Sequence, residues 1–159
     1  MSGKTHSYKA TIAWTGNKGT GTSGYRDYGR EHTISVENKP TLEGSSDPAF
    51  RGDPSKYNPE DMLICSLSTC HMLTYLHLCA VNNVIVLKYE DQVTGIMDET
   101  PDGGGHFTEV TLHPRVWISG ESMRAKAKEL HHEAHKRCFI ANSVNFPVKH
   151  ESRELLPGE

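Results

Sequence analysis

One long apolar segment constrains the fold of this chain more than any other feature. Asn58 is a good helix N-cap, and Pro59 suits the first helical position. Glu60 and Asp61 place negative charge in the first turn, where it complements the positive end of the helix dipole. Residues 62–81 are apolar on nearly every side of such a helix. The pattern therefore predicts a buried central helix.

Extended segments are expected on both sides of this helix. Residues 8–14 and 28–36 would pair as a hairpin, and residues 37–57 would form a long ordered loop. Two longer strands, a second helix and a last loop with a short strand would follow, at 84–96, 106–118, 121–137 and 142–150. This order indicates an α+β fold rather than strict βαβ alternation.

The chain length and composition favour one small domain that needs help to bury its core. A length of 159 residues suits one compact domain, or one protomer of an intimate oligomer. Hydrophobic residues make up 35% of the chain and the mean hydropathy is -0.58. Because small domains bury a lower fraction of their surface, a partner subunit would supply part of the missing cover.

The charge pattern argues against two classes of partner. The net charge is -3, from 17 Lys and Arg against 20 Asp and Glu, and no basic block is present. A nucleic-acid binder needs clustered basic residues, so we expect no nucleic-acid partner. No segment approaches the roughly 20 apolar residues of a membrane span, so we expect no membrane partner.

The N-terminal sequence and the four cysteines indicate a reducing compartment. The N-terminus shows no apolar run after a positively charged region, so no signal peptide is expected. We therefore expect a cytoplasmic location, where thiols are mostly kept reduced. In that setting, four cysteines indicate buried, catalytic or metal-binding thiols rather than a disulfide framework.

Helix periodicity separates the three cysteines of the first helix. Cys65 and Cys70 lie about 140° apart around a helix axis, and Cys70 and Cys79 lie on nearly opposite faces. The three thiols therefore cannot bind one metal together. Free cysteines are among the most buried residues, so we expect Cys65 and Cys79 to pack in the core.

Two cysteines have neighbours that suit a reactive thiol. Cys70 follows small polar residues that leave room beside it, namely Ser66, Ser68 and Thr69. Cys138 ends the second helix after the basic residues 135–137, whose positive charge favours the thiolate. The negative end of the helix dipole disfavours the thiolate, and the sequence leaves both outcomes open.

Several short motifs together resemble the OsmC/Ohr family of thiol peroxidases. They are Asn58-Pro59-Glu60 at the start of the central helix, Cys70 ten residues after the glutamate, and His135-x-x-Cys138 at the end of the second helix. The resemblance implies an OsmC-like α+β fold with antiparallel sheets wrapped around two central helices. It also implies an intertwined homodimer, with one such domain over residues 1–159.

The resemblance further implies a peroxidase mechanism. Cys70 matches the thiol that attacks the O–O bond and becomes a sulfenic acid. Cys138 matches the thiol that forms a disulfide with it, and a small or lipoyl-type dithiol would then reduce this disulfide. Organic hydroperoxides are the expected substrates, with hydrogen peroxide as an alternative. The resemblance implies no cofactor and no metal.

In this family the glutamate at the helix start pairs with an arginine that lies over the thiolate, and Glu60 matches that glutamate. An arginine suits this place because its guanidinium stays charged and can bond sulfur, carboxylate and substrate. Arg51, nine residues before Glu60, matches the OsmC branch best and is our choice. Arg26 matches the Ohr branch and is the alternative, with Arg30 close by. The sequence Phe139-Ile140 departs from the Pro-Tyr of the Ohr branch, so the substrate stays open.

A metal site is the first competing hypothesis. His131 and His135 have the i, i+4 spacing that binds Zn²⁺ on one face of a helix. His132 and Cys138 are near them in sequence. An amphipathic helix with exposed polar histidines would give the same pattern.

Two further hypotheses are a phosphate-binding loop and a non-catalytic protein on the same fold. Residues 16–24 are rich in glycine and contain a lysine, but no GK[ST] follows and the next segment has the pattern of a strand. Phosphate cradles need a helix N-terminus at this point, so a hairpin loop is favoured. A stress or ligand-binding protein without catalysis stays open, because fold alone does not give function.

Overall fold

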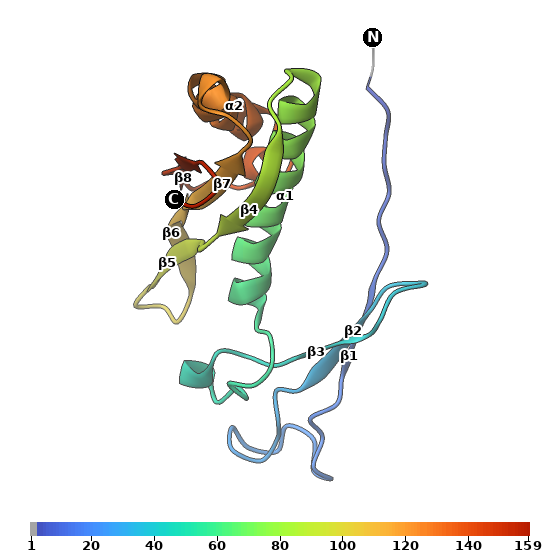
Figure 1. Ribbon diagram of the computed structural model, residues 1–159. Coiled ribbons are helices and arrows are strands. Elements are labelled where there is room, and N and C mark those ends of the chain that lie inside the picture. The colour runs from blue at the N-terminus through green and yellow to red at the C-terminus, as the bar shows by residue number, and fades with distance from the viewer. Residues whose placement is uncertain (1–2) are drawn as a thin grey trace. The chain divides into compact units, whose positions relative to one another are not determined.

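The computed structural model describes residues 3–159 (Figure 1). They form two compact units, and the boundary between the units falls after Met62, in the first turn of helix α1 (Pro59–Val81). The expectation of a single domain over residues 1–159 stays a prediction. The first unit holds one small sheet, and the second holds two sheets, helix α2 (Arg124–Arg137) and most of α1.

The sheet of the first unit has three short antiparallel strands. They are β1 (Thr11–Trp14), β2 (His32–Ser35) and β3 (Leu42–Gly44), in the order β1-β2-β3. The predicted hairpin is confirmed, although both strands are shorter than expected. Strand β3 lies inside the predicted long loop, because three residues are too few to show an alternating pattern.

The Gly-rich loop between β1 and β2 is tied together by its backbone. Gly29 donates a hydrogen bond from its amide to the carbonyl of Gly16 over 2.8 Å, and the indole of Trp14 donates to the carbonyl of Gly29 over 2.8 Å. A Cβ atom on Gly16 would come within 2.0 Å of the Gly29 oxygen, so this position requires glycine. The loop leads into strand β2 rather than a helix, as the hairpin hypothesis requires.

Helix α1 begins and ends where the sequence predicts. Asn58 accepts a hydrogen bond at its Oδ1 atom from the amide of Asp61 over 2.8 Å, and the Asp61 carboxylate accepts one from the amide of Asn58 over 3.3 Å. At the other end Asn83 adopts a left-handed φ of 59°, and Val84 donates its amide to the carbonyl of Cys79 over 2.9 Å. This is the usual geometry of a helix C-terminus.

The second unit covers only one side of α1. The buried side chains on that side are Leu67, His71, Tyr75, Leu78 and Cys79. On the other side Leu73 is 64% exposed and Val81 is 62% exposed. Burial all around the helix is therefore not achieved within the second unit, where apolar side chains remain available for further contacts.

By length and composition α1 is also apolar enough to cross a membrane, so the expectation that no segment approaches this is wrong. The serines, threonines and histidines of the helix interrupt the run of apolar residues, but its mean hydropathy still reaches that of a membrane span. The core helix of a soluble protein passes the same test. The absence of a membrane partner stays a prediction.

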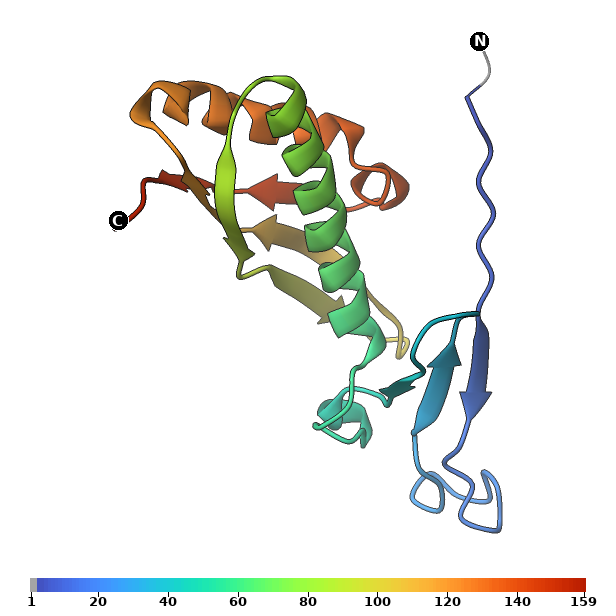
Figure 2. The same ribbon diagram turned by 45° about the vertical axis from the view of Figure 1, so that its right-hand side comes forward.

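The second unit contains two three-stranded sheets (Figure 2). One sheet has the order β4-β7-β9, with β4 (Val86–Asp91), β7 (Pro114–Ile118) and β9 (Arg153–Leu155). The other has the order β5-β6-β8, with β5 (Thr94–Glu99), β6 (Gly105–Leu112) and β8 (Val148–His150). The β4–β7 and β5–β6 pairs are antiparallel, whereas β8 and β9 add in parallel at their edges.

Both long strands expected from the sequence are broken into two, at residues 92–93 and at His113. The carboxylate of Asp91 stabilises both breaks. It accepts a hydrogen bond from the amide of His113, at the second break, over 2.7 Å, and one from the hydroxyl of Ser68 on α1 over 2.5 Å. The breaks are set by a contact with α1, so the local sequence pattern gives no sign of them. Strand β9, after the expected last strand, was likewise missed.

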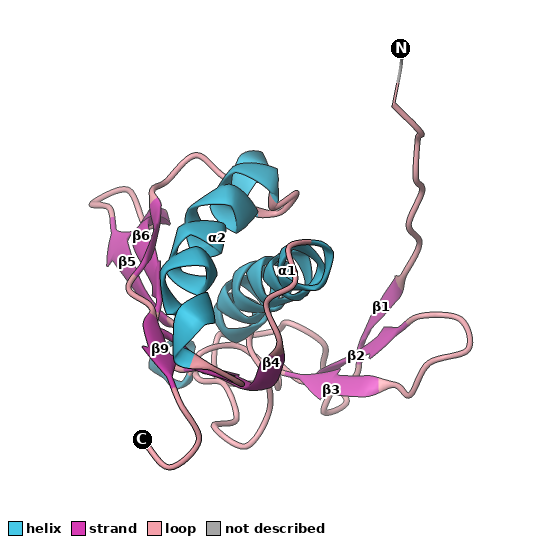
Figure 3. Cartoon of the chain, turned by 45° about the horizontal axis from the view of Figure 1, so that its top comes forward, coloured by secondary structure: helices cyan, strands magenta, loops and turns pink. Residues whose placement is uncertain are grey.

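Helix α2 packs beside α1 (Figure 3). It follows a short 3-10 turn at Glu121–Met123, so the predicted span of 121–137 is confirmed in two parts. Its buried side chains Ala127, Leu130 and Ala134 join Tyr75 of α1 in one core cluster. The Tyr75 hydroxyl donates to the carbonyl of Ala127 over 2.9 Å, so the polar end of the ring is satisfied inside the core.

The two helices also share a buried pair of histidines. His71 Nε2 and His131 Nδ1 are 3.0 Å apart and hydrogen-bonded, and the His131 ring stacks on Tyr75 with 3.8 Å between centroids. Burial, with the neighbouring histidines as a smaller cause, lowers the pKa of His71 to about 4 and that of His131 to about 3. Both rings are neutral near pH 7, so the 3.6 Å contact of His131 with Glu154 is not an ion pair there.

These histidines should make the fold sensitive to mild acid. Their folded pKa values lie below the ordinary value of 6.5. The unfolded chain therefore binds more protons than the folded chain between about pH 6.5 and 4, and the folded state loses stability as the pH is lowered through this range. The unfolding free energy, measured with urea at several pH values, should depend less steeply on pH in His131→Gln, by about 1 kcal/mol per pH unit. The exposed His106→Gln serves as the control. Equal slopes in the two variants would contradict this account.

Candidate functional site

The structure brings Cys70 and Cys138 together. Cys70 lies on α1 and is half-buried, and Cys138 is the residue directly after α2 and is 1% exposed. Both are free thiols, and Cys70 lies close enough to Cys138 to influence the pKa of its thiol. Two residues far apart in the sequence are therefore neighbours in the structure, and their roles as the attacking and the resolving thiol stay predictions.

The surroundings of Cys138 keep its thiol protonated. Burial is the main cause that raises its pKa to about 11, and the neighbouring Cys70 adds to this. The amide of Ala141, 3.4 Å from Sγ, opposes the rise but does not outweigh it. Lys136 and Arg137 are exposed and contact the carboxylate of Glu133 at 3.1 and 3.9 Å. Their positive charge is paired with that carboxylate. The sequence left open whether the Cys138 thiolate is favoured, and burial is what raises the pKa of this thiol.

Three small polar residues around Cys70 bond the helix backbone, whereas Ser68 donates to the Asp91 carboxylate. The hydroxyl of Thr74 donates to the carbonyl of Cys70 over 2.9 Å, and that of Thr69 donates to the carbonyl of Cys65 over 2.8 Å. Ser66 donates in the same way to Leu63 over 2.7 Å. These hydroxyl groups turn back on the helix, so their hydrogen bonds are made to backbone carbonyls and not to the Cys70 thiol.

The other two cysteines behave differently from each other. Cys79 is buried as expected, and burial raises its pKa. Cys65 is exposed, so the expectation of core packing is wrong for it within this chain. It lies on the side of α1 that the second unit leaves uncovered, and helical spacing alone could not show which side that would be.

The arginines considered from the sequence all lie in the first unit. Arg30 is fixed by hydrogen bonds to the carbonyls of Tyr28 and Tyr25, over 2.6 and 2.8 Å, and its guanidinium stacks on both rings. Arg51 is exposed, has a left-handed φ of 64°, and places its guanidinium 5.9 Å from the ring centroid of Tyr25. Arg26 is exposed. Arg30 therefore has a structural role, whereas Arg51 and Arg26 remain candidates for the arginine that activates the thiolate.

Glu60 makes no ion pair in residues 3–159, with Arg51, Arg26 or any other basic residue. Glu60 and both arginines belong to the first unit, whereas the two cysteines belong to the second. The roles assigned to these three residues stay predictions.

The histidines do not form the metal site considered as an alternative. The Nδ1 atom of His131 is hydrogen-bonded to His71, and its ring is enclosed in the core. Across the described part of the chain, no group of three or more His, Cys, Asp or Glu side chains is placed to hold a metal ion. The sequence pattern does not predict the buried group of His71, His131 and Glu154, because these residues lie on α1, α2 and β9 and have no fixed spacing.

The comparisons with known proteins agree with this architecture. The family model for OsmC-like proteins matches residues 52–153. An OsmC-like protein of unknown function from Vibrio cholerae has a similar structure, with a TM-score of 0.83 and 30% identity over 94% of this chain and all of that one. No protein with a curated description matches the chain.

Two more distant structures show the same fold. One is an organic hydroperoxide resistance protein OsmC from Legionella pneumophila, with a TM-score of 0.70, 17% identity and coverage of 96% and 99% of the two chains. The other is an organic hydroperoxide resistance protein from Elizabethkingia anophelis, with a TM-score of 0.69, 17% identity and coverage of 96% and 98%. From the family match and the shared fold, the chain belongs to the family of OsmC-like proteins.

Proposed function

We propose that this protein is a thiol peroxidase that reduces organic hydroperoxides with Cys70 and Cys138. The observation that carries the proposal is the proximity of these two free thiols, one on α1 and the other directly after α2. Two neighbouring free thiols can form a disulfide where their Cα atoms lie within about 7 Å of each other. The names of the Legionella and Elizabethkingia proteins support an organic hydroperoxide over hydrogen peroxide as the substrate.

The reaction balances as a two-electron exchange. The Cys70 thiolate attacks one peroxide oxygen, the O–O bond breaks, and the other oxygen leaves as an alcohol after taking up a proton. Cys70 is then a sulfenic acid, and Cys138 attacks its sulfur and displaces water. A small or lipoyl-type dithiol reduces the resulting disulfide by exchange, which restores both thiols and oxidises the dithiol.

The different surroundings of the two thiols support these separate roles. Cys70 is partly exposed, so a peroxide can reach it. Cys138 is buried with its pKa raised to about 11, so it is a poor first nucleophile at neutral pH. The proton of Cys138 can leave with the hydroxide of the sulfenic acid as water, so a high pKa does not prevent the second step.

Activation of Cys70 needs a cation, which we assign to Arg51, with Glu60 holding it in position. Arg26 is the alternative. The guanidinium would stabilise the thiolate and polarise the peroxide. We also propose an intertwined homodimer in the cytoplasm. The exposed apolar side of α1, with Leu73 and Val81, supports the dimer because a partner subunit would cover it.

Replacing Cys70 should abolish turnover. The pure protein with a dithiol reductant should consume cumene hydroperoxide, and Cys70→Ser should lower kcat/KM by at least about 100-fold, because the nucleophile is lost. Cys65→Ser is the matched control, since it removes an exposed thiol of the same helix, and it should keep near-normal activity. No turnover in the wild type with any peroxide would favour the non-catalytic binding protein instead.

Replacing Cys138 should stop the cycle after its first step. Cys138→Ser should release one equivalent of alcohol and retain Cys70 as a sulfenic acid, because no thiol is in place to displace water. Dimedone labelling followed by mass spectrometry would locate the sulfenic acid. Labelling at Cys65 or Cys79 in place of Cys70 would show that the roles are assigned wrongly.

Arg51 and Arg26 can be separated by their effect on the rate. Arg51→Gln should lower kcat/KM for the hydroperoxide by about 10-fold or more, since a cation near a developing thiolate contributes at least that much. Arg26→Gln should have little effect. The reverse result would transfer the role to Arg26, and no effect in either variant would exclude both.

A further inference from the structure

A hollow lies where the two sheets of the second unit join. It has a volume of about 570 Å³ and lies at the breaks where β4 continues into β5, β6 into β7, and β8 into β9. The chain crosses from one sheet to the other three times at this place. Polar side chains from all three crossings line the hollow, including Gln92, His113 and Ser152.

Two arginines stand side by side in this lining. Arg115 of β7 and Arg153 of β9 are direct partners in the parallel register. Like charges in direct register repel each other. Glu90 relieves Arg115 only in part, since its carboxylate is 3.7 Å from the guanidinium. Within the part of the chain that the structure describes, Arg153 has no carboxylate within ion-pair distance.

The rest of the lining supplies a single carboxylate, and that carboxylate is paired with a histidine. Glu151 is the only acidic residue of the hollow, and its carboxylate lies 3.6 Å from Nδ1 of His113. The other ring nitrogen of His113 lies 3.2 Å from the hydroxyl of Thr94. Gln92 and Ser152 are neutral. The Glu151 carboxylate is therefore paired with His113 and not with Arg115 or Arg153.

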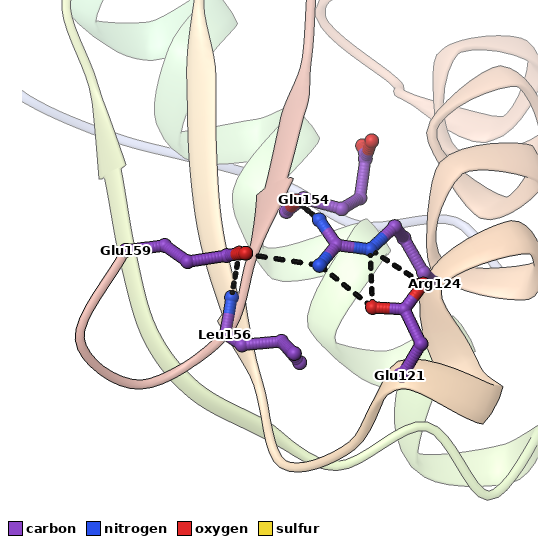
Figure 4. A network of polar contacts seen from close by, with 5 residues as sticks. All are labelled: Glu121, Arg124, Glu154, Leu156 and Glu159. Atoms are coloured by element: carbon purple, nitrogen blue, oxygen red, sulfur yellow. Dashed lines mark hydrogen bonds and ion pairs between the residues drawn. The ribbon is translucent and has the colours of Figure 1, made fainter.

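In a second hollow of the same unit, the guanidinium of Arg124 has hydrogen-bond and ion-pair partners on all sides. Arg124 contacts the carboxylates of Glu121 at 2.8 Å and Glu159 at 3.2 Å, and donates to the backbone carbonyl of Glu154 (Figure 4). The Glu159 carboxylate also accepts a hydrogen bond from the amide of Leu156 over 2.7 Å. Every side of that guanidinium has an internal partner, which the Arg115 and Arg153 pair lacks.

We propose that the hollow binds a small oxyanion, a phosphate or a carboxylate, between Arg115 and Arg153. Two oxygens of one anion would bridge the two guanidinium groups and relieve their repulsion. The Trp117 ring, 4.9 Å from the Arg115 guanidinium, supports that side chain in place. Arg115 Nε is buried without a hydrogen-bond partner in the described residues, so a donor is still unused. The site is independent of the thiol chemistry proposed above.

Calorimetric titration tests this site with the full-length protein. Inorganic phosphate and succinate are the two probes, and they distinguish a phosphate source from a carboxylate source. Sodium chloride at equal ionic strength is the reference. At least one probe should bind saturably, and Arg153→Gln should weaken that binding by about 10-fold or more because one half of the clamp is lost. Lys126→Gln removes the same charge from an exposed place on α2 and should change binding by less than about 2-fold.

Thermal unfolding provides a second readout that does not depend on a heat signal. Phosphate or succinate should raise the melting temperature of the wild type, and of Lys126→Gln, more than chloride does. It should not do so for Arg153→Gln, an exposed position whose substitution leaves the core intact. Equal binding by Arg153→Gln and Lys126→Gln, or an effect of chloride as large as that of both probes, would overturn the proposal.

Discussion

The contact between α1 and α2 is the constraint on which the proposed chemistry depends. His71 and His131 are hydrogen-bonded across it, and Tyr75 stacks on His131 and bonds the backbone of α2. These contacts favour the observed relative position of the two helices, because a buried donor or acceptor that loses its partner is costly. Cys70 precedes His71 directly. Cys70 and Cys138 lie near each other in this same arrangement of the two helices.

Burial then gives the two thiols different properties without any further charged residue in the second unit. Cys138 is enclosed behind the end of α2, and its pKa rises to about 11. Cys70 keeps access to solvent along the more open side of α1. One accessible thiol and one buried thiol suit a two-step reaction. The buried thiol stays protonated and reacts only after a sulfenic acid has formed next to it.

The local parts of this structure could be predicted from sequence, and the non-local parts could not. The ends of α1 follow from Asn58 and Pro59, whose side chains act within one turn of the chain. The breaks near Asp91 and the exposure of Cys65 depend on what packs against α1, so periodicity could not show them. The pairing of Cys70 with Cys138 came from the family resemblance, since no spacing rule relates residues on two different helices.

The central claim is that Cys70 and Cys138 form one redox pair, and the most direct test is to map the thiols after oxidation. The wild-type protein would be treated with one equivalent of cumene hydroperoxide per subunit, blocked with an alkylating reagent, digested and examined by mass spectrometry. The account predicts the loss of two thiols per subunit, a disulfide between the peptides of Cys70 and Cys138, and unmodified Cys65 and Cys79. A disulfide that involves Cys65, or four free thiols after complete peroxide consumption, would contradict it.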